Sequence, residues 1–475
     1  MCVSQRPFRV ISDSDVMRIH EASVSILARL GVRVDDEGLR EDLQNHGCGV
    51  TKDRVTIPSG LIDRVLAAVK GEVSLRSHTG RSICIRQGGV WSHSTGGIPS
   101  VIDLETGQKR SATLKDFADA VRLMNKLDCD MPCALLYPVD VPAPISQVVQ
   151  FECLLRYSEK PVYGPGVSSP GEAKYIVELF NACASGDGFL GVVGISPESP
   201  LYYPKVITDT MRIIISARIP TVMLVAPLAG ISSPMTVAGS LAQLNANMLA
   251  FATISHIINP KTPLIYGARM NFPNMKTGQS IWGLPEVGVA GAIAVQLASS
   301  YGFLSDVYGL SCTSCTFDAQ AGYEKATNCL TAMLAGANLI SGLGSLASLT
   351  VASYEQLVID DEIFSAQKRV RRGVAVNEDT LALDVIEDVI KGGSFLEQEH
   401  TIRHLRGGEV FIPRLGFDRT WTEWDAAGQK DIREVAREFA RRHLAGSDCQ
   451  PIGEHLDREI NKVMQAARRD LVKER

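Results

Sequence analysis

The residues best suited to binding or catalysis lie between Tyr308 and Leu330, in the stretch YGLSCTSCTFDAQAGYEKATNCL. An apolar run ends there, a turn rich in Ser, Cys and Thr follows, and a helical pattern then begins. Asp318 stands where its carboxylate can accept hydrogen bonds from the first free amides of that helix. Because a strand-to-helix joint of this kind faces ligand in barrels, we expect the candidate site here.

Aromatic side chains recur at the ends of the predicted strands. The candidates for substrate binding are Tyr137, Tyr163, Tyr266, Tyr308 and, in a loop, Trp282. Rings gathered around one space attract a quaternary ammonium group. The same tyrosines could instead close the rim of a barrel, with each ring buried and each hydroxyl in water. The residues alone leave both interpretations open.

Four charged or titratable residues complete the candidate site. Arg269 can anchor a carboxylate through its guanidinium fork, although a salt bridge is the alternative. Asp318 and Glu324 are candidates for polar support of a ligand, with helix capping as the other role open to Asp318. His93, in WSHSTGG, is either a polar residue of the site or a buried core histidine.

The sequence does not predict a metal site. Cys312 and Cys315 form a single CxxC, and His400 and His404 lack the glutamate of HExxH. Cys312 could act as a nucleophile, but no adjacent histidine supports that role.

Composition narrows the class of protein. The chain has 475 residues, of which 45% are hydrophobic and 21% charged, and its net charge is −5. These values are typical of a folded α/β enzyme and argue against nucleic acid as the main partner. The eleven cysteines, an odd number, favour reduced thiols and a cytoplasmic location. The longest apolar run, 241–258, is interrupted by polar residues, so we expect no membrane segment.

The elements that must position the site alternate between short apolar strands and helices. Residues 1–90 predict helices followed by a β-hairpin, 91–372 predict eight βα units, and 373–475 predict a C-terminal extension that packs on the barrel or on a partner. The expected strands are 98–104, 133–139, 161–164, 189–196, 221–227, 263–268, 303–310 and 338–344. Eight consecutive units favour an α/β fold of the (β/α)8 TIM-barrel type, and the chain lacks the GxGxxG and GxxxxGK[ST] phosphate loops.

Three stretches resemble a known family. They are YGARMNFPNMKTGQSIWGLPEVGVAGAIAVQLASSYG, SDVYGLSCTSCTFDAQAGYEKATNCLTAMLAGANLISGLGSL and EQEHTIRHLRGGEVFIPRLGFDRTWTEW. They are similar to the trimethylamine methyltransferase family of corrinoid-dependent enzymes. Its archetypal members carry pyrrolysine near the end of the seventh strand, where this chain has Ser311, Cys312, Thr313, Ser314 and Cys315. The chain therefore resembles the branch without pyrrolysine.

The resemblance implies a function. Members of that branch demethylate quaternary amines such as glycine betaine, proline betaine or carnitine, and the methyl group passes to cobalamin held by a separate, cognate corrinoid protein. A quaternary nitrogen departs as a neutral tertiary amine, so the protein has to supply alignment and an aromatic shell. This chain lacks the DxHxxG corrinoid-binding signature, and we expect the cofactor to arrive on the partner.

Two other functions stay open at this point. One is a barrel hydrolase or lyase that uses Asp318, Glu324 or His93 as acid or base. The other is a subunit that binds a betaine without catalysis. The apolar residues between Val410 and Trp424 also make a homo-oligomer plausible.

Overall fold

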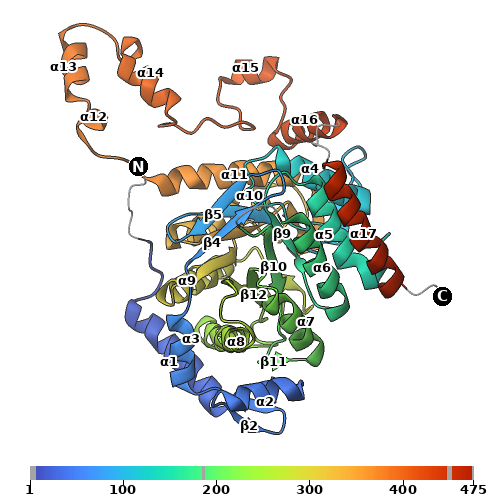
Figure 1. Ribbon diagram of the computed structural model, residues 1–475. Helices are drawn as coiled ribbons and strands as arrows, with labels where there is room; N and C mark the ends of the chain where they lie inside the picture. Colours follow the sequence, from blue (N-terminus) through green and yellow to red (C-terminus); the bar gives the residue numbers. More distant parts are fainter. Residues whose placement is uncertain (1–6, 185–187, 447–451, 473–475) are drawn as a thin grey trace.

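The computed structural model describes residues 7–184, 188–446 and 452–472, and its centre is a parallel barrel (Figure 1). Seven strands pair in the order β6-β17-β16-β13-β12-β10-β9, and every pairing is parallel. Met131 and Cys133 close the remaining gap, through bridges to His93 of β6 and Tyr163 of β9. The strands are β6 (Trp91–Ser94), β9 (Val162–Gly166), β10 (Gly191–Ile195), β12 (Thr221–Val225), β13 (Leu264–Ala268), β16 (Leu304–Tyr308) and β17 (Leu339–Leu343). The predicted TIM-type α/β fold is confirmed.

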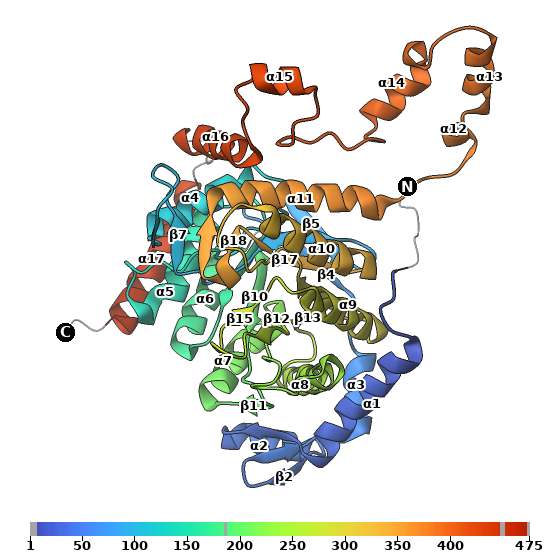
Figure 2. The ribbon, with the colours of Figure 1, turned by 180° about the vertical axis from the view of Figure 1, so that it is seen from behind.

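A ring of helices surrounds the strands (Figures 1 and 2). Its members are α4 (Leu114–Asn125), α5 (Ser146–Tyr157), α6 (Pro170–Cys183), α7 (Lys205–Ser216), α8 (Val237–Ile258), α9 (Pro285–Ser300), α10 (Ala319–Ala335) and α11 (Tyr354–Arg372). Among the described residues, α8 is the helix long and apolar enough to cross a membrane, and 78% of its most apolar window is buried inside the protein. That burial is typical of a core helix.

The first two predicted strands are wrong in position. The first barrel strand is β6, whereas β7 (Ser100–Ile102) joins a separate sheet with β8 (Lys109–Ser111), β18 (Ser345–Leu346) and β19 (Val351–Ser353). The second barrel position is held by residues 131–133 instead of 133–139. Hydrophobic patterning missed β6 because its sequence, WSHS, turns a polar side chain, His93, into the barrel.

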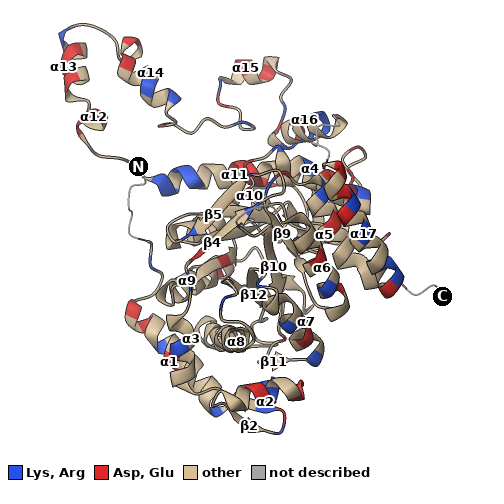
Figure 3. Ribbon diagram, viewed as in Figure 1, with Lys and Arg blue, Asp and Glu red and all other residues tan. Residues whose placement is uncertain are grey.

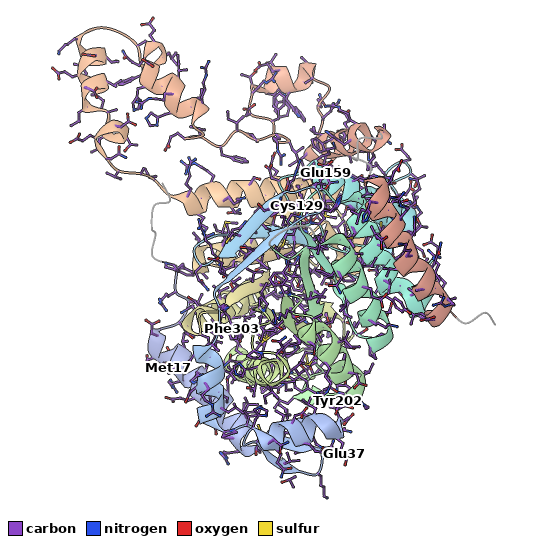
Figure 4. All side chains as sticks on the ribbon, viewed as in Figure 1. Met17, Glu37, Cys129, Glu159, Tyr202 and Phe303 are labelled. Carbon is purple, nitrogen blue, oxygen red and sulfur yellow. The ribbon has the colours of Figure 1, made fainter. Side chains whose placement is uncertain are left out.

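The predicted hairpin is confirmed, and it closes the amino-terminal end of the barrel. Strands β4 (Glu72–Arg76) and β5 (Ser82–Arg86) pair antiparallel. Val73, Leu75 and Ile85 form one apolar cluster with inward-facing residues of five strands, which are Val192, Val222, Ile265, Leu304 and Leu339. Just after the hairpin, Gln87 donates to the carbonyl of Phe303, a residue labelled in Figure 4. The polar interior is therefore confined to the other end.

The N-terminal elements cover α8 from outside. Helices α1 (Asp13–Arg29) and α3 (Ser59–Ala67) pack on it, and α2 (Glu37–Asn45) lies next to them. Short strands β1 (Val32–Val34), β2 (Gly49–Thr51) and β3 (Arg54–Thr56) form a sheet with β11 (Tyr202–Tyr203), which follows β10.

After α11 the chain leaves the barrel as an arm, residues 374–431 (Figures 1 and 2). The arm contains α12 (Glu378–Leu381), α13 (Leu383–Lys391), η3 (Phe395–Glu397), α14 (Glu399–Arg406) and α15 (Trp421–Ala426), and none of these five helices buries a residue. Both signs of charge run along it (Figure 3). The chain then returns to pack α16 (Ile432–Ala445) on α11 and α17 (Glu454–Leu471) on α6.

Candidate functional site

Alternation along the barrel strands turns three polar side chains inward. On β16, Leu304 points into the apolar cluster beneath the hairpin, which we call the apolar plug. Asp306 and Tyr308, two and four residues later, therefore face the same interior. On β13, Ile265 faces inward, and Arg269, four residues later, therefore faces inward as well. The polar side chains of β16 and β13 therefore meet beyond the apolar plug, at the carboxyl ends of the strands.

Asp306 is the centre of the polar group. It is fully buried, and its Oδ2 accepts from Arg269 Nη2 at 2.6 Å and from the Tyr163 hydroxyl at 3.0 Å. Its Oδ1 lies 3.1 Å from His93 Nε2. Burial alone would raise the pKa of Asp306, but Arg269 and His93 outweigh it and hold that pKa well below its usual range. Asp306 is therefore an anion at neutral pH.

His93 has acceptors at both ring nitrogens. Nε2 faces the Asp306 carboxylate, and Nδ1 lies 2.6 Å from the Ser94 carbonyl oxygen. One ring N–H therefore has an acceptor whichever tautomer is present. The ring stacks on Tyr163, with 4.1 Å between centroids and 13° between planes.

Arg269 and Tyr308 form the other wall. The guanidinium carbon lies 4.5 Å from the centre of the Tyr308 ring, and Trp282 packs on that ring in a T-shaped arrangement with 4.6 Å between centroids. The Tyr308 hydroxyl is 3.0 Å from Thr95 Oγ1. Arg269 also donates to the backbone oxygens of Asp306, at 2.7 Å, and Ala268, at 3.1 Å. These contacts fix the direction of both side chains.

These residues border a cavity of about 320 Å³. That volume is at the small end of the range for small-molecule sites. Of the predicted site residues, Tyr137, Tyr163, Arg269 and Tyr308 line it, and Trp282 supports it through Tyr308. Its other lining residues are His93, Ser94, Thr95, Gly96, Gly97, Cys133, Gln147, Gln150, Gly164, Pro165, Gly166, Leu224 and Ser341.

The structure does not bring Tyr266 to this cavity, which corrects our prediction for it. Tyr266 is fully buried on the outer side of β13, and its hydroxyl donates to Asn245 Oδ1 of α8 at 3.0 Å. The physical reason is the strand alternation, since Ile265 and Arg269 face inward and Tyr266 must then face the helices.

Asp318 and Glu324 lie outside the cavity lining and hold the loop after β16. Asp318 caps α10 by accepting from the Ala321 amide at 3.0 Å. Glu324 accepts from the Thr313 amide at 2.6 Å, and Thr313 Oγ1 accepts from the Gly283 amide at 3.0 Å. A Cβ at Gly283 would lie 2.0 Å from the Glu324 carboxylate, so a larger residue there would displace Glu324 from the Thr313 amide. Both acids are thus engaged by backbone amides.

Cys312 is buried in the same loop. Burial raises the pKa of its thiol to about 11, and the nearby Lys325 offsets this only in part. A thiol with that pKa is neutral at pH 7 and a weak nucleophile.

Sequence reasoning missed Asp306, Lys325 and Asp360. Lys325 of α10 and Asp360 of α11 are fully buried and 2.8 Å apart. Lys325 also donates to the carbonyl of Leu310 at 2.6 Å, and Asp360 accepts from the Gly344 amide at 2.8 Å. The pair thereby holds the residues just after β16 and β17. A carboxylate within the apolar strand run FLSDVYGL was the available signal for Asp306.

The fold and the site define an α/β-barrel protein with a polar, partly aromatic small-molecule cavity at the carboxyl ends of its strands. A family model described as trimethylamine methyltransferase (MTTB) matches residues 2–471, and the chain belongs to that family of methyltransferases.

Relatives of the chain agree with this assignment. The chain is 28% identical over 467 residues to trimethylamine methyltransferase MttB of Desulfitobacterium hafniense, with 96% of this chain and 93% of the relative covered. It is 27% identical over 469 residues to glycine betaine methyltransferase of another strain of that species, with 97% and 96% covered. It is 29% identical to MttB of Methanosarcina barkeri, with 96% and 94% covered.

A solved structure agrees on the fold. The crystal structure of the hydroxylamine MtmB complex superposes with a TM-score of 0.53 at 14% identity, and 98% of this chain and 89% of that chain are covered.

Proposed function

We propose that the chain transfers a methyl group from a quaternary amine, of the betaine class, to the corrinoid cofactor of a partner protein. The observation that carries this proposal is the cavity of about 320 Å³ bordered by Tyr137, Tyr163 and Tyr308 beside Arg269. Aromatic faces suit a trimethylammonium group, and a guanidinium suits a carboxylate, so the two wall types match the two ends of a betaine.

Arg269 has donors left for a substrate. Its hydrogen bonds to Asp306 and to the Ala268 carbonyl use three of its five N–H groups. The Asp306 carboxylate also offsets the guanidinium charge, which limits its repulsion of a nearby ammonium. Arg269 can therefore orient a carboxylate while a cation lies against the rings.

The loop after β16 supports the quaternary amine over trimethylamine. Positions 311–315 are Ser, Cys, Thr, Ser and Cys, and the sequence contains only the twenty standard residues. One relative is a glycine betaine methyltransferase. Because a quaternary nitrogen leaves as a neutral amine, methyl transfer from it needs no proton donor in this loop.

Two glycines leave part of the cavity rim open, which supports the approach of a cofactor carried by a partner. A Cβ built at Gly97 or at Gly166 would meet no atom within 4 Å, so both glycines border open space. A reduced corrinoid supplies the nucleophile for the methyl group when it is bound. The part of this chain would be to orient the amine, through the rings and Arg269, and to exclude water.

A transfer assay tests the proposal. The purified chain is mixed with a corrinoid protein, reduced to the cob(I) form, and with glycine betaine, proline betaine, carnitine or trimethylamine. We expect methylcobalamin, followed by its absorption spectrum, and a demethylated tertiary amine with at least one betaine. Methyl transfer from trimethylamine alone would contradict the substrate class. No transfer, with binding of a betaine in calorimetry, would favour a binding subunit.

A further inference from the structure

The arm carries a group of metal-ligating side chains remote from the barrel mouth. Asp379 of α12 and His400 and His404 of α14 each place one ligand atom within 4.8 Å of the other two. The histidines are four residues apart on one helix, so they share a face. Asp379 lies 21 residues before His400, a spacing that no common metal-binding motif predicts.

The separation between two of these atoms matches a shared cation. His404 Nε2 lies 3.2 Å from Asp379 Oδ2, but it is a buried atom with no hydrogen-bond partner. Zinc binds nitrogen and oxygen at about 2.0–2.1 Å, which places two ligands of a tetrahedral ion about 3.3 Å apart. The two atoms thus have the spacing of neighbouring ligands without being bonded to each other.

Surrounding contacts orient the ligands. Asp379 Oδ1 accepts from Arg403 Nη2 at 2.5 Å, which leaves Oδ2 for the site. His400 Nε2 lies 2.9 Å from the carbonyl oxygen of Asp379, and in the tautomer that donates there, Nδ1 keeps its lone pair. Ligand histidines in proteins usually donate their other N–H to a carbonyl or a carboxylate in this way.

The helices of the arm have no hydrophobic core of their own to stabilise their arrangement. Helices α12, α13 and α14 bury no residue, and Gly392 and Gly393 lie between α13 and η3. Segments too small to bury a core are commonly stabilised by a metal ion or disulfides. An ion held by α12 and α14 would close the intervening loop and fix the two helices together.

We propose that Asp379, His400 and His404 bind one divalent transition-metal ion of the zinc type, and that this ion fixes α12 against α14. The three protein ligands leave one tetrahedral position for water. The site is separate from the methyl-transfer cavity, and the proposal does not depend on the substrate.

Metal titration of the full chain tests the site. The protein is stripped with a chelator, and zinc is added in competition with a chromophoric chelator. We expect one ion per chain, and with Co²⁺ the visible absorption of a four-coordinate ion. His400→Ala and His404→Ala should each weaken binding by more than the roughly 10–100-fold that loss of an outer-shell partner costs. His455→Ala, at an exposed histidine of α17, is the matched control and should bind as the wild type does.

Limited proteolysis tests the structural role. Zinc should slow cleavage within 374–406 in the wild type and in His455→Ala, and it should not in His404→Ala, whose barrel is checked by circular dichroism. Absence of stoichiometric zinc in the wild type, or equal affinity in all three variants, would overturn the site. Zinc binding without a change in proteolysis would overturn the role in fixing α12 against α14.

Discussion

At the scale of single residues, we expect Asp306 to stabilise the barrel mouth. Asp306→Asn removes the anion that faces both Arg269 and His93. Loss of one partner from a buried ion pair costs about 3–5 kcal/mol because the other charge stays buried. We expect the free energy of unfolding in urea to fall by that amount. Asp209→Asn breaks a partly exposed pair with Lys205 and should cost less than about 1 kcal/mol. Equal costs for the two variants would contradict the role given to Asp306.

The ring of Tyr308 matters for substrate, on the proposed function, more than its hydroxyl does. Tyr308→Phe keeps the ring and loses the contact with Thr95, so we expect the Kd for the preferred betaine to change little. Tyr308→Leu removes the aromatic face, and a cation–π contact of about 1–2 kcal/mol corresponds to roughly 5–30-fold weaker binding. Calorimetry measures both. Tyr323→Leu, at an exposed tyrosine of α10, is the control, and a loss of the same size there would argue against a cage.

Single residues also show what sequence could predict about the site. The prediction that residues at strand ends lie together holds for Tyr137, Tyr163, Arg269 and Tyr308, which line one cavity. The reason is that a barrel brings the ends of its strands together. It misplaced Tyr266, whose inward or outward direction depends on where the strand register begins. The partners of Arg269 were not predictable either, since Asp306 comes from a different strand, 37 residues later.

At the scale of elements, the Lys325–Asp360 pair joins α10 and α11 to the ends of β16 and β17. Lys325→Met leaves the Asp360 carboxylate buried without its cation, and we expect a loss of about 3–5 kcal/mol in urea unfolding. The double variant Lys325→Met/Asp360→Leu should lose less than the sum of the single variants. Lys115→Met, at an exposed lysine that pairs with Asp119, should change stability by less than about 0.5 kcal/mol. Strict additivity in the double variant would contradict the coupling.

The junction of α5 and α6 predicts a pH-dependent stability. Glu172 is buried, and burial raises the pKa of its carboxyl from 4.5 to about 7, although it accepts from the Gln147 amide. Because the folded state raises the pKa, this group's stabilisation is complete below pH 4.5 and is lost as pH rises to about 7. The free energy of unfolding of Glu172→Gln, measured in urea, should therefore rise relative to that of the wild type by up to about 3 kcal/mol between pH 4.5 and 8. Glu178→Gln, at a less buried glutamate of the same helix, is the control, and an equal effect there would contradict the role of burial at Glu172.

The order of helices and strands was largely predictable from the sequence. The helices and most strands follow periodicity, because apolar faces must be buried against one another. The first barrel strand was not found because β6 places His93, a residue of the site, where periodicity expects an apolar side chain. The departure from the pattern thus coincides with the cavity.

At the scale of the whole molecule, the arm leaves a large apolar surface uncovered. Of the 25 exposed large apolar side chains among the described residues, 14 lie in the arm, between Val374 and Trp421, and Leu396 is 82% exposed. Monomeric proteins rarely expose so much apolar surface in one region. A second copy of the chain is one partner that can cover this surface permanently.

We therefore expect the chain to form a stable oligomer through the arm. Light scattering after size exclusion should give at least twice the chain mass of 51.4 kDa. Ile390→Glu and Leu396→Glu place a charge on the apolar faces of the arm and should shift the mass towards one chain, because a buried unpaired carboxylate opposes association. Leu30→Glu, at an exposed leucine beside α1, should leave the mass unchanged. A wild-type mass of one chain across micromolar concentrations would contradict self-association, and the uncovered arm would then be a surface for a different protein.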